Sequence, residues 1–100
     1  MRTVMVRYKT SEAHAAAKEA LVHAVFDELR EKTPTGIGYT TYRLADGVSF
    51  VHVATMVSAD GDPLTRLPAF KASQKGIADR CVELPVVTEM SAVDSYAAVS

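Results

Sequence analysis

The sequence lacks the features that define several whole classes of protein. Its single cysteine, Cys81, excludes an internal disulfide and a zinc site built on cysteines. Basic and acidic residues are nearly equal in number, 11 against 12, so the charge favours neither nucleic acid nor an anionic membrane as a partner. No apolar run approaches the roughly 18 residues of a membrane span, and Met1 leads directly into a strand-like pattern where a signal peptide would need an apolar run. We therefore expect a cytoplasmic protein with no nucleic-acid or membrane partner.

The motifs of common metal and cofactor sites are also missing. The sequence has no His-Glu-x-x-His motif, no phosphate-binding loop and no Gly-x-Ser-x-Gly elbow. A Gly-Ile-Gly sequence at 36–38 lacks the following helix that a dinucleotide-binding fingerprint requires. His14 and His23 lie more than two turns apart along a helix, which is too far to share one metal ion. We therefore predict neither a bound metal nor a cofactor.

The periodicity of apolar residues predicts six elements in the order βαββαβ. Alternation predicts strands over 2–9, 37–44, 48–57 and 86–93, and helical spacing predicts helices over 12–32 and from 68 to about 81. A polar loop is expected over 58–63. This order is typical of one α+β domain, expected over 1–96, in which a four-stranded antiparallel sheet carries two helices on one face. The small residues of 97–100 are expected to form a frayed tail.

The second and third strands should form a hairpin around Asp46 and Gly47, because Asp-Gly between two alternating runs favours a two-residue turn. With these residues at the centre of the turn, Arg43 opposes Phe50 and Thr41 opposes His52. One face of the hairpin is then expected to hold Tyr39, Thr41, Arg43, Phe50, His52, Ala54 and Met56. The other face is expected to hold Tyr42, Leu44, Val51, Val53, Thr55 and Val57.

Both faces of the third strand are mostly apolar, although two helices can cover only one face of the sheet. Val51, Val53 and Val57 would lie in water unless a further layer covers them. A second copy of the sheet supplies that layer, since twofold homodimers commonly bury the same apolar face of each subunit. We therefore predict a homodimer with stacked sheets, and we place the helices and any pocket on the opposite face, which carries His52.

The chain resembles the dimeric α+β barrel proteins, and within them the antibiotic biosynthesis monooxygenase-like group. The resemblance lies in the element order, the Asp-Gly hairpin and the sequence Leu67-Pro68-Ala69-Phe70 that opens the second helix. It covers almost the whole chain. It implies a ferredoxin-like βαββαβ unit and a dimer whose two sheets form a barrel. It also implies a pocket between the sheet and the helices of each subunit.

The expected pocket face carries residues suited to a small-molecule ligand. His52 could accept a proton from an acidic phenol or carbon acid, because imidazole titrates near neutral pH, or it could be a hydrogen-bonded core residue. Arg43 could hold an oxyanion through its forked donors, or it could point into solvent at the end of the hairpin. Tyr39 could donate its hydroxyl to a ligand or pack against a helix. Phe50 and Phe70 complete the set of candidate ligand-binding residues.

Two functions fit these residues. The first, which the resemblance implies, is a cofactor-independent, monooxygenase-like enzyme for a small aromatic or polyketide-like substrate, with His52 as base and Arg43 and Tyr39 holding the anion. The chain has no tryptophan, which some heme-degrading relatives use in their pockets, so heme degradation is disfavoured. The alternative is a non-catalytic dimeric module that binds a small ligand or a partner, in which His52 only completes the core. Under the enzyme hypothesis, His52→Ala should abolish turnover and leave the dimer intact, whereas under the module hypothesis it should change mainly the stability. A closed core without a cavity at these residues would exclude the enzyme.

Overall fold

The structure is a computed structural model, and it describes residues 2–57 and 64–98. Its strands are β1 (Arg2–Thr10), β2 (Ile37–Arg43), β3 (Ser49–Met56) and β4 (Cys81–Met90). Its helices are α1 (Glu12–Lys32), α2 (Pro68–Gln74) and α3 (Ile77–Arg80), and a short 3-10 helix, η1 (Leu64–Arg66), precedes α2. The loop predicted over 58–63 lies outside the described residues, as do the last two residues of the predicted tail.

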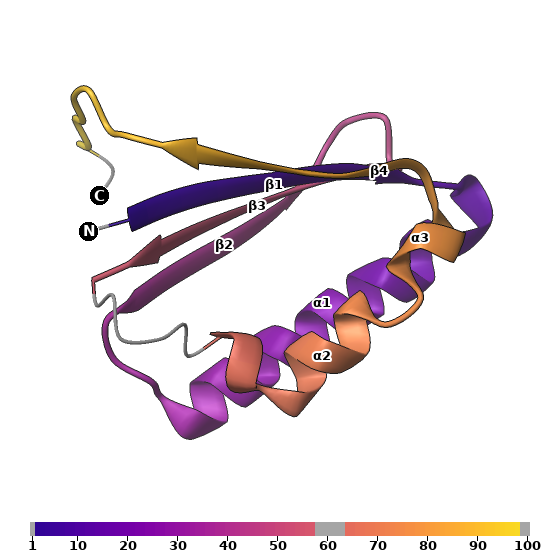
Figure 1. Cartoon of the computed structure of the whole chain (residues 1–100), viewed down its shortest axis with the longest axis horizontal. Helices are drawn as coiled ribbons and strands as arrows, with labels where there is room; N and C mark the ends of the chain where they lie inside the picture. Colours follow the sequence, from indigo (N-terminus) through magenta and orange to yellow (C-terminus); the bar gives the residue numbers. More distant parts are fainter. Residues whose placement is uncertain (1, 58–63, 99–100) are drawn as a thin grey trace.

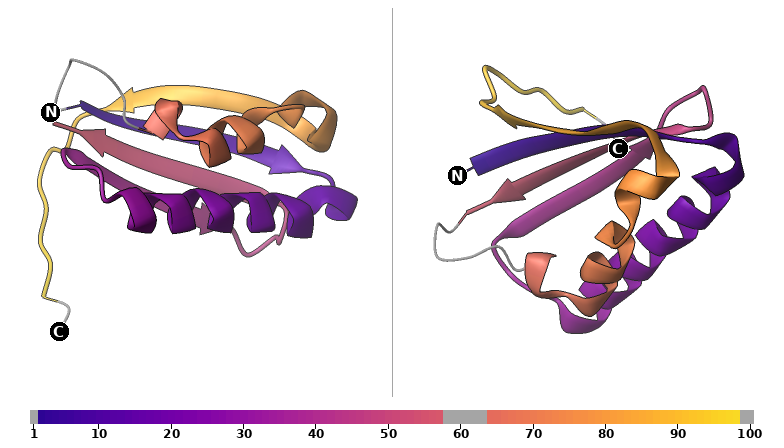
Figure 2. Two further views of the ribbon diagram at one scale, coloured as in Figure 1. Left: turned by 90° about the horizontal axis from the view of Figure 1, so that it is seen from below. Right: turned by 45° about the vertical axis from the view of Figure 1, so that its right-hand side comes forward.

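The four strands form one antiparallel sheet in the order β2-β3-β1-β4. Figures 1 and 2 show α1 and α2 side by side on the same face of this sheet. No helix among residues 2–57 and 64–98 covers the opposite face. The ferredoxin-like α+β fold predicted from the sequence is therefore confirmed.

α1 covers the sheet with residues spaced three or four positions apart, the spacing that brings side chains to one face of a helix. Its buried residues are Ala15, Lys18, Val22 and Val25. Val25 packs with Leu64 of η1 and with Leu67 just before α2, and these three form the core between the helical elements. These contacts hold the layer of helices together at one end of the sheet. Lys18 is the one charged residue in the buried stripe of α1.

The hairpin of β2 and β3 has the predicted register, in which Thr41 faces His52. Asp46 shapes its turn, because one carboxylate oxygen accepts the backbone N–H groups of Val48 and Ser49 and the other accepts the Ser49 hydroxyl. The hydrogen bond from the Ser49 hydroxyl, followed by the two from backbone N–H groups, lowers the pKa of the Asp46 carboxyl to about 2. This turn sets which residues of both strands face the helices.

The segment after α2 differs from the prediction of one helix reaching Cys81. Gly76 adopts a left-handed conformation (φ 68°) that an α-helix cannot continue, so α2 ends before it and α3 begins after it. β4 begins at Cys81, before the predicted start at residue 86, and ends at Met90, before the predicted end at residue 93. Pro85 fits inside β4 because this is an edge strand, where a missing N–H on the open side removes no ladder hydrogen bond.

The face of the sheet away from the helices is rich in apolar side chains. Val53 of β3 lies at its centre, next to Met5 of β1 in the strand register. Val86 of β4 is 63% exposed, and Val57, just beyond β3, is 65% exposed. No helix in the described part of the chain is both long and apolar enough to cross a membrane.

Candidate functional site

A cavity of about 180 Å³ lies between the sheet and the helices. Alternate residues of β1 form one wall, from Arg2 at one end to Tyr8 at the other, so the cavity runs along this strand. The lining consists of Arg2, Val4, Val6, Tyr8, Tyr39, His52, Ala54, Met56, Leu64, Phe70 and Gln74. Most of these side chains are apolar, and the groups that can exchange protons are confined to two tyrosines and one histidine.

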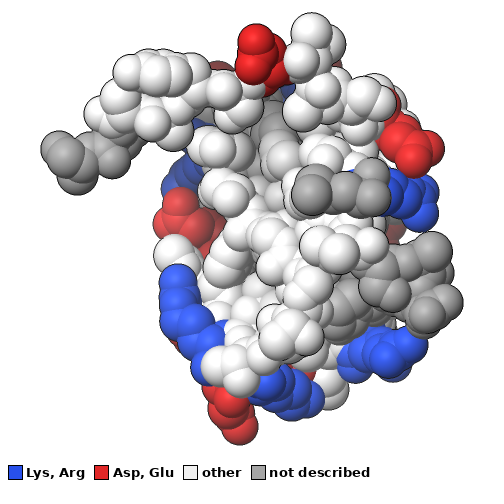
Figure 3. All heavy atoms as spheres, turned by 90° about the vertical axis from the view of Figure 1, so that its left-hand side faces the viewer, with Lys and Arg blue, Asp and Glu red and all other residues white. Residues whose placement is uncertain are grey.

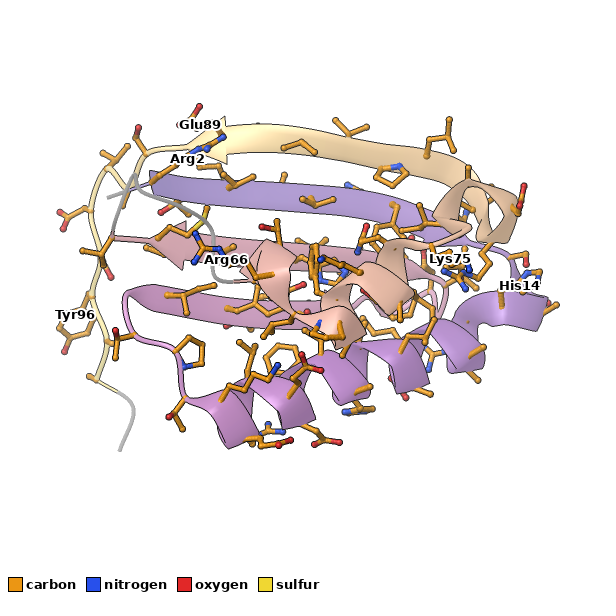
Figure 4. The ribbon with its side chains drawn as sticks, turned by 60° about the horizontal axis from the view of Figure 1, so that its bottom comes forward. Arg2, His14, Arg66, Lys75, Glu89 and Tyr96 are labelled. Atoms are coloured by element: carbon orange, nitrogen blue, oxygen red, sulfur yellow. The ribbon has the colours of Figure 1, made fainter. Side chains whose placement is uncertain are left out.

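Charged side chains lie at the end of the molecule where β1 begins. Figure 3 views this end, and uncharged side chains fill its centre while lysine and arginine side chains gather at its lower edge and flanks. Arg2, which lines the cavity, forms an ion pair of 3.3 Å with Glu89 of the neighbouring β4. Figure 4 shows these two side chains together at the strand ends, away from His14 at the opposite end of the molecule.

His52 connects two tyrosines on the wall of the cavity. Its Nε2 lies 2.7 Å from the hydroxyl oxygen of Tyr8, and its Nδ1 lies 2.6 Å from that of Tyr39 and 2.9 Å from that of Thr41. A neutral imidazole has one N–H and one acceptor nitrogen, so it donates on one side and accepts on the other. Tyr8, His52 and Tyr39 therefore form one hydrogen-bonded chain, called the Tyr-His-Tyr chain below, and all three residues belong to the cavity lining.

Stacked aromatic rings fix the position of this chain. The ring of Tyr8 stacks on those of Phe50 and His52, with centroids 5.6 and 5.3 Å away. The ring of Tyr39 stacks on His52 at 5.7 Å and on Phe26 of α1 at 5.1 Å. Stacked rings at such distances pack favourably, so the hydroxyl and imidazole groups have little freedom to turn away from the cavity.

Burial keeps His52 and Tyr8 of the Tyr-His-Tyr chain uncharged. His52 is 6% exposed, and loss of hydration, followed by repulsion from the Lys18 ammonium, lowers the pKa of its imidazole to about 4. Loss of hydration is also the main reason why the pKa of the Tyr8 phenol lies far above its ordinary value. At neutral pH the imidazole is a neutral base and the Tyr8 phenol holds its proton.

The structure brings together three of the five residues that the sequence singled out. Tyr39, His52 and Phe70 line the cavity. Phe50 does not line it; the residue is 1% exposed, and its ring stacks on that of Tyr8. Phe50 therefore supports the site from behind without facing the cavity.

Arg43 lies outside the cavity. Its Nε donates to the carbonyl oxygen of Gly47 at 2.8 Å, and its Nη1 forms an ion pair of 3.3 Å with Glu19 of α1. Both contacts hold the guanidinium at the surface, where the hairpin meets α1. Arg43 is therefore not part of the cavity site.

Tyr8 and Lys18 are the residues that sequence reasoning did not select. Tyr8 carried a weak signal, because it alternates with Val4 and Val6 on one face of the first strand. Lys18 carried a clearer one, since it lies four positions before Val22 and so on the apolar side of the predicted helix. Neither pattern reveals the contact of Tyr8 with His52 or that of Lys18 with the Tyr8 ring, because these contacts depend on how β1 and α1 pack against β3.

A second hollow, of about 230 Å³ and more open, lies between α1 and the start of β2. It shares Tyr39 with the first cavity, and its other lining residues are Phe26, Leu29, Arg30, Pro34 and Ile37. It has no imidazole. Across 2–57 and 64–98, no group of three or more His, Cys, Asp or Glu side chains is arranged to hold a metal ion. The cavity of His52 is therefore the stronger candidate site.

Comparison with known proteins finds solved structures with a similar fold. No protein-family model matches the sequence, and no curated protein gives a match. Rv0793 from Mycobacterium tuberculosis is similar in structure, with a TM-score of 0.74 and 20% identity over 96% of this chain and 98% of that one. A protein named antibiotic biosynthesis monooxygenase has a TM-score of 0.76 and 17% identity over 94% of this chain and 100% of its own.

SnoaB from Streptomyces nogalater, described as a cofactor-independent oxygenase and solved in a mutant form, is also similar. It has a TM-score of 0.65 and 17% identity, and the match covers 94% of each chain. At such identities a structural match establishes the fold alone. This chain has the ferredoxin-like α+β fold that is found in antibiotic biosynthesis monooxygenase-like structures.

Proposed function

We propose that the chain is a monooxygenase-like enzyme that needs no cofactor of its own and acts on a small aromatic phenol or enol. The observation that carries this proposal is the Tyr-His-Tyr chain on the wall of a mostly apolar cavity. The fold supports it, because SnoaB, a protein of the same fold, is described as a cofactor-independent oxygenase. His52 is the proposed catalytic residue, and Tyr8, Tyr39 and Phe70 are the proposed ligand-binding residues.

The chemistry begins with removal of a proton from the substrate. A substrate hydroxyl beside Tyr39 or Tyr8 donates its proton to the tyrosine oxygen while that tyrosine passes its own proton to the acceptor nitrogen of His52. His52 is thus reached through a tyrosine, which suits an imidazole that is almost fully buried. The resulting substrate anion is richer in electrons than the neutral phenol and is the form that reacts with O2.

The size of the cavity limits the substrate. An apolar cavity of about 150 Å³ holds a molecule as large as benzene. The cavity of this chain is slightly larger, about 180 Å³. It accommodates one ring with its substituents.

A non-catalytic module that binds a small ligand is the second candidate, and one observation favours it. A general base is most effective when its pKa lies near the operating pH, and the pKa of His52 is about 4. Proton transfer from an ordinary phenol of pKa about 10 to this imidazole is unfavourable by roughly 8 kcal/mol. The enzyme proposal therefore requires a further group that stabilises the substrate anion.

Oxidation of 1,4-dihydroxybenzene in the presence of ¹⁸O2 separates the two candidates. In a monooxygenase reaction, this phenol and O2 give 2-hydroxy-1,4-benzoquinone and water, so the product contains one labelled oxygen. We expect the protein to raise the rate of labelled product formation above that in buffer, and we expect His52→Ala to reduce the protein-dependent rate roughly a hundredfold. Mass spectrometry of the product measures both.

His23→Ala is the matched control, because His23 lies exposed on α1 and does not line the cavity. This variant should keep the wild-type rate. Equal amounts of labelled product with and without protein would contradict the enzyme proposal. Saturable binding of the phenol without turnover would support the module instead.

We also propose that the chain forms a homodimer in the cytoplasm through the open face of the sheet, where Val51, Val53 and Val57 lie. The support is the exposure of apolar side chains on that face, which a second copy of the same face would remove from water. Stacking in this way leaves the cavity of each subunit on the outer side of the dimer, next to the helices.

A further inference from the structure

The ammonium group of Lys18 is buried behind the Tyr-His-Tyr chain. The residue is 0% exposed, and its Nζ donates to the carbonyl oxygen of Ser73 at 2.6 Å. The same Nζ lies over the ring of Tyr8, 5.2 Å from its centroid. Burying an ammonium group is unfavourable unless it is paired, and a lysine this deeply buried usually has a carboxylate partner.

Arg80 of α3 adds a second positive charge beside Lys18. Its Nη2 donates to the carbonyl oxygens of Ser73 and Lys75, at 3.2 and 2.6 Å. Its Nε is buried and has no hydrogen-bond partner among the described residues. Within 2–57 and 64–98, neither Lys18 nor Arg80 forms an ion pair with a carboxylate. Two cations therefore share this region without a negative charge beside them.

These hydrogen bonds have a structural role, since the last carbonyl groups of a helix lack partners within the helix and α2 ends here. A carbonyl oxygen carries only a partial negative charge, however, and α2 is a helix of 7 residues. Capping α2 accounts for the direction in which the two side chains point. It does not neutralise a whole ammonium and a whole guanidinium.

Among residues 2–57 and 64–98, no group around Lys18 supplies the missing negative charge. Lys18 lies over the Tyr8 ring of β1, and its charge interacts with His52 of β3, Arg80 of α3 and Cys81 of β4. Burial raises the pKa of the Cys81 thiol, and both Tyr8 and His52 are neutral at pH 7. Burial, followed by repulsion from Arg80, lowers the pKa of Lys18 to about 8, which leaves the ammonium mostly protonated at neutral pH.

We propose that the cavity binds its ligand as an anion, a phenolate or enolate held at the Tyr8 and Tyr39 hydroxyl groups, and that Lys18 is the buried counter-charge for this anion. The inference rests on the proposed function and deepens it by naming the charge of the ligand. Lys18 acts across the Tyr8 ring without touching the ligand, so it is a positioning residue. Lys18 thus supplies the positive charge that was expected from Arg43, which lies outside the cavity.

The charge of Lys18 also compensates for the low pKa of His52, which makes the imidazole a weak base. A cation in a buried site favours the ionised form of a nearby acid, so the bound phenol gives up its proton more readily than the free phenol. The ligand anion in turn favours protonated His52, which raises the pKa of the imidazole from its value in the empty cavity. Both changes make the proton transfer less unfavourable.

Ionisation of bound 4-nitrophenol tests the inference, because the phenolate of this probe absorbs visible light and the phenol does not. At a pH below the pKa of the free probe, we expect wild-type protein to increase the fraction of phenolate as the site is filled. Lys18→Met should lower the phenolate-to-phenol ratio of the bound probe about tenfold, the effect of one charge nearby at intermediate dielectric. Lys71→Met, which removes an exposed lysine of α2, should change the ratio less than twofold.

Equal ratios in wild type and Lys18→Met would overturn the role of Lys18 while leaving the proposed function in place. Failure of the probe to bind wild-type protein at all would overturn both. Should Lys18→Met fail to fold, the ¹⁵N signal of the Lys18 side chain in wild-type protein gives a second measurement. Because coupling between ligand and proton binding is reciprocal, the Lys18 pKa should rise when 4-nitrophenol binds. An unchanged value would contradict the inference.

Discussion

Val53→Asp should convert a dimer into a monomer. Val53 lies at the centre of the open sheet face, on β3 between β1 and β2, with Met5 and Thr40 facing it in the two neighbouring strands. In the proposed dimer an aspartate here would be buried without a partner, which costs about 4 kcal/mol and weakens association roughly a thousandfold. In the monomer the same aspartate lies in water, so the fold itself should persist.

Sedimentation equilibrium at micromolar concentration checks this result. We expect wild-type protein at twice the chain mass of 10.8 kDa and the variant at the chain mass itself. His23→Asp places the same charge on the exposed side of α1 and should leave the dimer intact. A wild-type protein that sediments as a monomer would refute the proposed interface. Loss of the far-UV circular dichroism signal in Val53→Asp would show that Val53 is required for folding rather than for association.

Acid should destabilise the protein through His52. The pKa of the imidazole is about 4 in the folded chain and about 6.5 in an unfolded one, so between these values the unfolded chain binds a proton that the folded chain does not. The contribution of His52 to the free energy of unfolding should therefore be fully present above pH 6.5 and should be lost as the pH falls toward 4. The loss is about 3 kcal/mol over the whole window.

Urea unfolding at pH 7 and at pH 4.5 measures this loss, and His52→Gln isolates the part due to the imidazole. Glutamine keeps a donor and an acceptor for the tyrosine hydroxyl groups but does not titrate. We expect the variant to lose less stability than wild type between the two pH values, whereas His23→Gln should behave like wild type. An identical loss in wild type and His52→Gln would show that His52 is not protonated on unfolding.

The sequence was most informative where one local feature determines many positions. The Asp46-Gly47 turn fixes the register of β2 against β3, so it correctly places Tyr39 and His52 on the same face. Helical spacing in the same way locates α1 with its end at Lys32. In both cases the pattern and the structure involve residues that are close in the chain, and no long-range packing is needed to interpret them.

The site itself depends on contacts between distant segments. β1 pairs with β3 so that Val6 faces His52, and Tyr8 then reaches the imidazole from the next position on the same face. Nothing within β1 specifies this register. Lys18 meets Tyr8 only because α1 crosses the sheet above it. Arg43 was assigned to the correct face, but its position at the strand end lets it turn to Glu19 at the surface.

The direct test of the account is the response of His52 to a ligand in the cavity. Titration of ¹⁵N-histidine-labelled protein with 4-nitrophenol monitors all 3 histidines at once by NMR. We expect a large and saturable shift of the His52 ring nitrogens, and little change at His14 and His23, which lie exposed on α1. Tyr8→Phe and Tyr39→Phe should each reduce the shift, because each removes one hydroxyl group of the Tyr-His-Tyr chain. Unchanged His52 signals at saturating probe would contradict the assignment of this cavity as the functional site.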